Sequence, residues 1–259
     1  MPKNQSFIPL LKQIAFEAGE KILDIYYAED FEINLKSDKS PITEADLLAH
    51  QIIYKKLEST GIPILSEEGK SISYQERKKW NKFWMIDPID GTKEFIKRND
   101  EFTINIALIE NQKPILGLVY APAFDKLYFG GIEMGAFLQE NKNPPKELFI
   151  PKKNNTVLRI ATSRSHLNKK TKTFIENLKQ ETKTIPVGSS LKFMLLAENK
   201  IDIYPRFSPC MEWDTAAAHA ILSGMNIEII NAENHKPLLY NKENLYNPNF
   251  IVKTKCNLI

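Results

Sequence analysis

Apolar residues near the N-terminus recur at the spacing of an amphipathic helix. Seven of them fall on one helical face, namely Ile8, Leu11, Ile14, Ala15, Ala18, Ile22 and Ile25. We expect this helix to end near Tyr26, where a polar stretch begins, and residues 38–41 have turn chemistry. A second helix is expected to start at Thr43 and to run through Leu57 to Gly61, because Thr43 and Asp46 have the spacing of a capping box.

Short apolar runs predict the strands of a first, α+β half. Residues 62–65 and 83–86 have the length of buried strands, and the second run is expected to stop at Asp87 and Pro88. Further strands are expected at 102–110, 115–120, 127–129 and 136–138, the first two as antiparallel neighbours joined by residues 111–114.

A change of pattern after residue 156 predicts an α/β second half. Residues 141–156 have the composition of a linker, although residues 148–150 within it have the character of a strand. Strands are then expected near 158–161, 201–204 and 227–230, and helices near 169–178, 191–197 and 213–222. We therefore expect one unit over residues 1–259, with subdomains of about 1–150 and 156–259.

Composition and charge narrow the class of protein. The 259 residues are 42% hydrophobic and 26% charged, which is typical of a globular chain with a sizeable core. A net charge of +3 is too balanced for a protein that coats nucleic acid or an acidic membrane, so a charged partner is expected to be a small molecule.

Cysteine usage and the absence of long apolar runs favour the cytoplasm. Cys210 and Cys256 stand outside any metal-type spacing, so neither a disulfide framework nor a structural zinc site is expected. The N-terminus lacks the apolar region of a signal peptide, and no run is long enough for a membrane-spanning helix.

The segment Asp87-Pro88-Ile89-Asp90-Gly91-Thr92 is the strongest candidate for chemistry. Two carboxylates three residues apart, on a turn restricted by Pro88 and tightened by Gly91, can point the same way and offer the oxygen ligands that Mg²⁺ requires. The same residue types also form ordinary polar turns. A second acidic pair, Glu67-Glu68, follows the run at 62–65, and acidic residues that converge from two strand ends repel one another unless a cation is bound.

Two further acidic residues have two open interpretations each. Asp214 stands at the head of an alanine-rich segment, where an aspartate is a good N-cap. Asp46 stands where a capping box places its acid relative to Thr43. Spacing alone is compatible with helix capping and with a role in the acidic site.

Taken together, these motifs resemble the inositol monophosphatase family of lithium-sensitive, magnesium-dependent phosphomonoesterases. Glu67-Glu68, residues 87–92 and Trp213-Asp214 occur in the order of the family's three metal-site motifs, and the similarity spans nearly the whole chain. Residues 37–46, 91–96 and 188–193 are similar to its 3′(2′),5′-bisphosphate nucleotidase branch. The resemblance implies an α/β fold, a layered α-β-α-β-α sandwich of the inositol monophosphatase and sugar phosphatase type. The first subdomain would carry most metal ligands, and the second would bind substrate and supply Asp214.

The resemblance also implies a cofactor of two or three Mg²⁺ ions. Glu67, Asp87 and the carbonyl oxygen of Ile89 match the ligands of one ion. Asp87, Asp90 and Asp214 match the ligands of a second ion. The family's lithium sensitivity is expected to act through the same carboxylates.

Catalytic and substrate-binding roles follow from the same resemblance. Asp46 and Thr92 match the pair that orients the attacking water, and Glu67 completes the catalytic set. The amides of Gly91 and Thr92 match those that receive the scissile phosphate. The implied substrate-binding positions are Glu67, Asp90, Gly91, Thr92, Ser189, Lys192, Arg206 and Asp214, with His166 as a further candidate.

The implied activity is hydrolysis of the 3′-phosphate of adenosine 3′,5′-bisphosphate, with its sulfated relative PAPS as a second substrate, to yield AMP and phosphate. The nearest alternative is an inositol or sugar monophosphatase, because the metal motifs specify the reaction and not the alcohol. A non-catalytic metal- or lithium-binding regulatory module is the alternative from another class, and the intact Asp46 and Thr92 pair disfavours it. Relatives attach peripherally to the inner membrane face, but no basic amphipathic helix here requires that location. The sequence specifies no oligomeric state.

Overall fold

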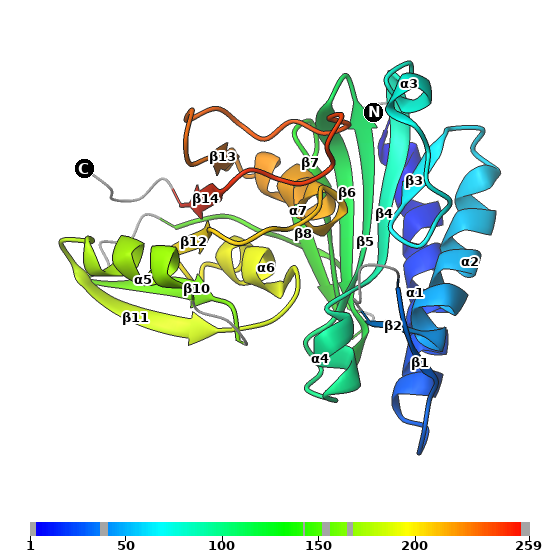
Figure 1. The fold of residues 1–259 in the computed structure, drawn as a ribbon, viewed down its shortest axis with the longest axis horizontal. Coiled ribbons are helices and arrows are strands. Elements are labelled where there is room, and N and C mark those ends of the chain that lie inside the picture. Colours follow the sequence, from blue (N-terminus) through cyan, green and yellow to red (C-terminus); the bar gives the residue numbers. More distant parts are fainter. Residues whose placement is uncertain (1–3, 37–40, 142, 152–155, 165–167, 255–259) are drawn as a thin grey trace.

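The protein contains two β-sheets with helices packed on their faces (Figure 1). A computed structural model describes residues 4–36, 41–141, 143–151, 156–164 and 168–254. The larger sheet has seven strands in the order β3-β4-β5-β6-β7-β8-β9, and the smaller has five in the order β11-β10-β12-β14-β13. A short hairpin, β1-β2, stands apart from both. Within the described residues no helix is long and apolar enough to cross a membrane.

The helices and strands have the following bounds. The helices are α1 (Ile8–Tyr26), α2 (Glu44–Glu58), α3 (Tyr74–Arg77), α4 (Thr92–Ile96), α5 (Lys169–Glu176), α6 (Leu191–Ala197) and α7 (Trp213–Ser223). The strands of the hairpin and larger sheet are β1 (Ile33–Leu35), β2 (Pro41–Thr43), β3 (Ile64–Ser66), β4 (Lys82–Asp90), β5 (Thr103–Glu110), β6 (Lys113–Ala121), β7 (Lys126–Gly131), β8 (Gly135–Glu140) and β9 (Lys146–Glu147). Those of the smaller sheet are β10 (Val157–Thr162), β11 (Glu181–Pro186), β12 (Ile203–Arg206), β13 (Ile229–Asn231) and β14 (Phe250–Lys253).

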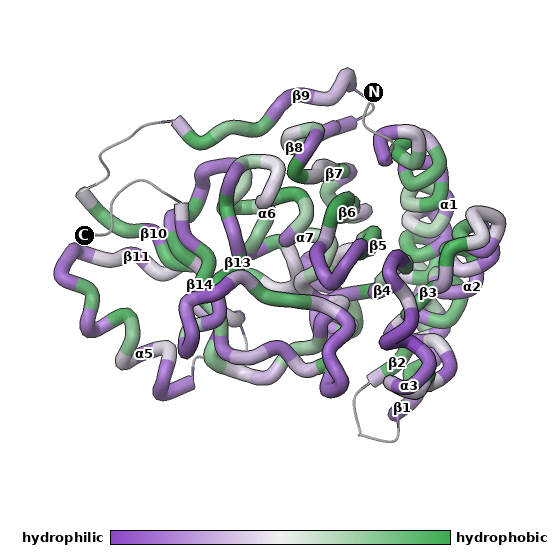
Figure 2. The backbone as a smooth tube through the Cα atoms, turned by 90° about the horizontal axis from the view of Figure 1, so that it is seen from above, coloured by the Kyte–Doolittle hydropathy of each residue, from purple (hydrophilic) through white to green (hydrophobic). Residues whose placement is uncertain are grey.

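The layers follow the order α-β-α-β-α, as expected. Figure 1 shows α1 and α2 on one face of the larger sheet and α6 and α7 between the two sheets. Apolar residues of α5 pack on the outer face of the smaller sheet, against Leu158, Ile160 and Ile203. The chain interior is apolar where the layers meet, and much of β6 is green in the hydropathy view (Figure 2). The predicted layered sandwich is therefore confirmed.

The first two helices form as their patterns predict. The apolar stripe of α1 is buried, and Leu11, Ile14 and Ile22 have no exposed surface. In α2, the Thr43 side chain accepts from the Asp46 amide, while the Asp46 carboxylate accepts from the Thr43 amide, so the capping box is present. Residues 38–40 of the predicted turn lie outside the described residues.

Strand β4 is buried on both faces, which explains its continuous apolar run. Phe83 and Met85 belong to the core on the α6 and α7 side, while Trp84 and Ile86 belong to the core under α1 and α2. Because side chains alternate along a strand, Asp87 continues the face of Phe83 and Met85 and points toward α7.

The expectation that this strand stops at Asp87 and Pro88 is wrong, because β4 extends to Asp90. Its pairing with β5 shifts register between Asp87 and Asp90. Proline has no N–H to donate, so Pro88 is accommodated in this irregularity without the loss of a ladder hydrogen bond.

Other segments also differ from the sequence prediction. The strand after β8 is Lys146–Glu147 and not residues 148–150. The β5–β6 connection is a two-residue turn at Asn111 and Gln112, both with positive φ (49° and 64°), so residues 113 and 114 belong to β6. Strands β1, β2, β11 and β14 and helices α3 and α4 have no predicted counterpart. β11 is a sheet edge whose residues are all exposed or half-buried, so it needs no apolar run.

Close packing of α7 against the larger sheet fixes where the helix begins. Gly117 of β6 lies directly under the helix, and a Cβ atom at this position would stand 2.1 Å from the carbonyl oxygen of Ala217. The small side chains of Ala216 and Ala217 allow the same approach from the helix side. This contact places the first turn of α7, with Asp214, beside the end of β4.

Candidate active site

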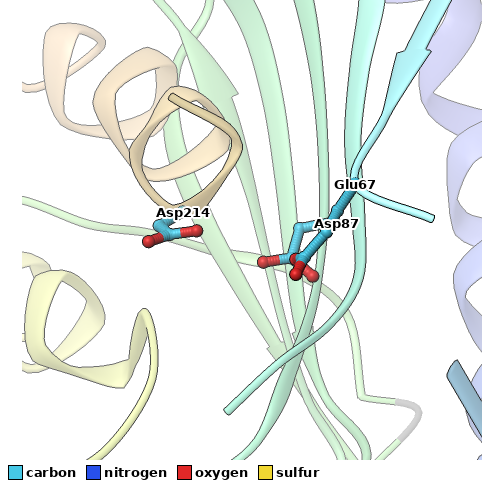
Figure 3. A group of neighbouring side chains, drawn as sticks. All are labelled: Glu67, Asp87 and Asp214. Carbon is cyan, nitrogen blue, oxygen red and sulfur yellow. The ribbon is translucent and has the colours of Figure 1, made fainter. Parts of the chain in front are cut away.

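Three carboxylates from separate segments converge at one edge of the larger sheet (Figure 3). Glu67, Asp87 and Asp214 each offer an oxygen, and these oxygens lie within 4.8 Å of one another. β3 and β4 pair in parallel, so Glu67, just past β3, comes level with the last part of β4, and its amide donates to the Ile86 carbonyl oxygen (3.2 Å). Asp214 reaches the cluster from the first turn of α7.

This carboxylate cluster carries more negative charge than its surroundings compensate. Burial raises the pKa of Asp87 well above its usual range, and the charges of Glu67, Asp90 and Asp214 raise it further. Burial, followed by the charges of Asp90 and Glu67, raises the pKa of Asp214 to about 8.

One oxygen of the cluster also lacks a partner. Asp87 Oδ1 is buried and has no hydrogen-bond partner among the described residues. An unpaired buried carboxylate oxygen is costly, and a set of hard anionic oxygens suits a divalent cation such as Mg²⁺. The residues present therefore fit the metal that the sequence implied.

Lys36 is a functional-site residue that the sequence analysis missed. Its Nζ donates to Glu67 Oε1 at 2.7 Å and to Glu68 Oε1 at 2.5 Å. Burial opposes a charge on Lys36, but the two glutamates outweigh it and raise the pKa of the ammonium. Lys36 follows the exposed strand β1, and its position in the sequence belongs to no motif. Its contact with the acidic residues is therefore visible only in the folded structure.

Asp90 lies next to the cluster but has different hydrogen-bond partners. Its Oδ2 accepts from the hydroxyls of Ser189 (2.9 Å) and Ser190 (2.7 Å). Its charge contributes to the raised pKa values of Asp87 and Asp214. Asp90 thus joins β4 to the segment that precedes α6.

Asp46, Thr92 and Ile89 are brought together by the start of α2 and the end of β4. The Thr92 hydroxyl lies 3.3 Å from Asp46 Oδ1 and 3.3 Å from the carbonyl oxygen of Ile89. Asp46 Oδ2 accepts from the Thr43 amide at 2.7 Å. Asp46 therefore caps α2 with one oxygen and contacts Thr92 with the other, so the two interpretations left open by the spacing are compatible.

The N-cap interpretation of Asp214 is wrong, because the N-cap residue of α7 is Glu212 and Asp214 lies in the first turn. Its Oδ2 accepts from the backbone amide of Met211 at 3.0 Å, so the side chain stabilises the segment that enters α7. The same carboxylate belongs to the cluster with Glu67 and Asp87.

A cavity of about 320 Å³ adjoins the carboxylates and is lined by both halves of the chain. The candidate site residues in its wall are Asp90, Gly91, Ser189, Lys192, Arg206 and Asp214. Asp46, Glu67, Asp87 and Thr92 lie outside this wall. His166 lies outside the described residues.

Lys192 and Arg206, two of the three cations of the cavity wall, are held by backbone carbonyl groups, and Lys93 is the third. Lys192 is buried, its Nζ donates to the carbonyl oxygens of Ser189 (2.7 Å) and Val187 (3.3 Å), and burial lowers its pKa to about 8. Arg206 donates from Nε to the carbonyl oxygen of Ser208 (3.2 Å) and from Nη2 to that of Pro209 (3.0 Å). Both cations are thus fixed in orientation at the cavity.

Comparison with known proteins gives one consistent result. The model of the inositol monophosphatase family matches residues 3–256. The 3′(2′),5′-bisphosphate nucleotidase CysQ of Escherichia coli is 40% identical over 244 residues, which cover 93% of this chain and 96% of that protein. The nucleotidase of the same name from Haemophilus influenzae is 34% identical over 252 residues, covering 96% of this chain and 93% of its own length.

Solved structures agree with the sequence matches. The crystal structure of CysQ from Bacteroides thetaiotaomicron has a TM-score of 0.88 and 42% identity, and the match covers 98% of this chain and 99% of that one. The suhB protein of Bartonella henselae shares the fold, with a TM-score of 0.78 at 21% identity over 96% of this chain and 94% of that one. This chain belongs to the inositol monophosphatase family.

Proposed function

We propose that this protein is a 3′(2′),5′-bisphosphate nucleotidase. It would hydrolyse the 3′-phosphate of adenosine 3′,5′-bisphosphate to give AMP and phosphate, and that of PAPS to give adenosine 5′-phosphosulfate and phosphate. The observation that carries the proposal is the cavity in which Asp90 and Asp214 share a wall with Lys192 and Arg206. Such a site offers a metal-binding end for the scissile phosphate and cations for a second one. The Escherichia coli and Haemophilus influenzae relatives, which match over nearly the whole chain, have this activity in their names.

The carboxylates would hold two or three Mg²⁺ ions. Glu67, Asp87 and the carbonyl oxygen of Ile89 are the proposed ligands of one ion, and Asp87, Asp90 and Asp214 are those of a second. When bound, such ions neutralise a phosphate dianion and make a coordinated water more acidic.

Asp46 and Thr92 are proposed to orient the attacking water and take its proton. Asp46 Oδ1 is free of the capping interaction and lies 3.3 Å from the Thr92 hydroxyl, which can donate to it while accepting from water. Burial, partly offset by Thr43, raises the pKa of Asp46, which makes it a better base.

The amides of Gly91 and Thr92 are proposed to receive the scissile phosphate. Gly91 has φ +98°, and a Cβ there would stand 2.9 Å from the Glu101 carbonyl oxygen, so only glycine gives this turn its shape. Ser189, Lys192 and Arg206 are the proposed contacts of the nucleotide and its other phosphate.

A substrate panel tests the proposal. Phosphate release would be measured from adenosine 3′,5′-bisphosphate, inositol 1-phosphate and fructose 1,6-bisphosphate, with magnesium and with a chelator. We expect magnesium-dependent turnover, with kcat/KM highest for the nucleotide by at least about tenfold, which corresponds to one charge-assisted contact. A preference for inositol 1-phosphate would favour the alternative phosphatase, and no release from any substrate would favour a non-catalytic module.

Replacing Arg206 by Ala is expected to raise KM for adenosine 3′,5′-bisphosphate about tenfold or more, because a charge-assisted hydrogen bond contributes about 1.5–3 kcal/mol. KM for adenosine 3′-monophosphate, which lacks the second phosphate, should change little. Steady-state kinetics on both substrates measure the difference.

R98A is the matched control, because Arg98 also donates to backbone carbonyl oxygens but stands outside the cavity wall. Equal losses on both substrates in R206A would remove Arg206 from the second-phosphate subsite. K192A is expected to act in the same direction.

Inhibition by lithium and a cytoplasmic location stay predictions of this proposal. The lithium prediction is that Li⁺ replaces Mg²⁺ at the carboxylates with half the charge. Turnover measured across a lithium titration at fixed magnesium tests it.

A further inference from the structure

Glu101, which stands two residues before β5, contacts two segments from the second half of the chain. Its exposed fraction is 8%, and it belongs neither to the carboxylate cluster nor to the residues that line the cavity. Its Oε2 accepts from the Gly188 amide at 2.7 Å and from Arg164 Nε at 2.8 Å. Arg164 Nη2 contacts the other carboxylate oxygen, so the arginine binds in the bidentate mode.

Both segments reach the cavity next to these contacts. Ser163, Gly188 and Ser189 line its wall. The Ser189 hydroxyl in turn contacts Asp90 Oδ2 (2.9 Å) and the Thr103 hydroxyl (2.7 Å). A shift of either segment would therefore change the shape of the cavity that receives the nucleotide.

Gly188 is closely packed against the side chains of Glu94 and Glu101. A Cβ at this glycine would stand 2.7 Å from Glu94 Cγ and 3.2 Å from Glu101 Cβ. The Arg164 side chain is 44% exposed and also donates to the Pro186 carbonyl oxygen (3.3 Å). Because an exposed ion pair adds little to global stability, its main effect is to fix the position of residues 163–164.

We propose that Glu101 is a positioning residue that holds residues 163–164 and 188–190 against the larger sheet and thereby sets the affinity for the bisphosphate substrate. This inference rests on the proposed function. Glu101 is not a cavity-wall residue, and the proposed water-orienting pair, Asp46 and Thr92, lies elsewhere. The carboxylate should thus affect KM and leave kcat nearly unchanged.

The kinetic test uses E101Q, R164A and the double variant. Gln keeps an acceptor for the Gly188 amide but loses the charge that binds Arg164. We expect KM for adenosine 3′,5′-bisphosphate to rise about tenfold in each single variant, with kcat within about twofold. Because both single variants break the same contact, KM of the double variant should be no higher than that of the more affected single variant. Unchanged KM, a fall in kcat alone, or additive losses would overturn the proposal.

D202N is the matched control. Asp202 forms a similar bidentate pair with Arg159 of β10, and both residues lie outside the cavity wall, so the loss of this pair should leave KM unchanged. An equal rise of KM in D202N would mean that any loosening of the smaller sheet raises KM, and it would overturn the specific role of Glu101.

Hydrogen exchange separates this proposal from the proposed function. In the substrate-free protein, the amide of Gly188 should exchange faster in E101A than in the wild type, because its acceptor is gone. Equal protection would overturn the positioning role even if the enzyme is a nucleotidase. Faster exchange in E101A, together with a wild-type protein that does not hydrolyse the nucleotide, would refute only the proposed function.

Discussion

Replacing Asp87 by Asn is expected to abolish turnover and, at the same time, to stabilise the metal-free protein. Asp87 is buried, lies at the centre of the carboxylate cluster and has one oxygen without a partner among the described residues. An amide is isosteric but supplies no negative charge, so the proposed ions lose a shared ligand. Changes in residues that only support metal ligands already lower metal affinity or activity about 10–100-fold. For Asp87 itself, we therefore expect kcat to fall by at least about a hundredfold.

The gain in stability has the same cause. Folding without metal brings Glu67, Asp87 and Asp214 to within 4.8 Å of one another in a buried site. Removing one of these charges relieves repulsion and desolvation, which we expect to raise the free energy of unfolding by about 1–3 kcal/mol. For a domain of this size, the melting temperature would rise by several degrees.

D24N is the control for the Asp87 variant. Asp24 pairs with Lys21 on the exposed surface of α1, so neither kcat nor the melting temperature should move appreciably. Near-normal kcat of D87N in saturating magnesium would remove Asp87 from the site. A lower melting temperature without metal would show that the charge stabilises the fold.

The sequence could predict helices and strands whose apolar pattern reflects burial against one core, and helix starts that are set by neighbouring residues. The stripe of α1 faces one core, and the capping box of Thr43 and Asp46 needs only neighbouring residues. The order of the acidic motifs was informative because Glu67 follows β3, Asp87 lies in the last part of β4, and these two strands pair in parallel.

Contacts between distant segments could not be predicted in this way. Lys36 contacts Glu67 and Glu68, which are 31 and 32 residues away along the chain, and no local pattern marks this contact. Pro88 stays within a strand because the register of β5 shifts opposite it. The partners of Glu101 are 63 and 87 residues away along the chain, and no local pattern marks them.

Magnesium is expected to stabilise the protein more at pH 8 than at pH 5. The pKa of Asp214 is raised to about 8 in the folded protein by burial and by the charges of Asp90 and Glu67, and burial raises that of Glu68 to about 7. Asp87 is raised as well. In the unfolded chain these groups have ordinary pKa values near 4, so between pH 4 and 8 the folded state binds more protons than the unfolded state.

The sign of the pH dependence follows from this difference. Stability falls with rising pH wherever the folded state binds more protons, so the raised acids contribute stability that is complete below about pH 4 and lost as pH passes the folded pKa values. Asp214 alone would account for at most about 6 kcal/mol. Bound magnesium favours the ionised carboxylates. It therefore offsets the loss of stability at high pH, where that loss is greatest, and it competes with protons for the carboxylates at low pH.

Thermal unfolding from pH 5 to 8.5, with magnesium or with sodium chloride at equal ionic strength, measures the effect. The metal-free melting temperature should fall as pH rises, and the shift caused by magnesium should grow over the same range. D214N is the matched variant, because it lacks the titrating group with a pKa of about 8 and should show a flatter profile and a smaller magnesium shift. A magnesium shift that is constant with pH, or equal in D214N, would mean that the carboxylates are not coupled to metal binding.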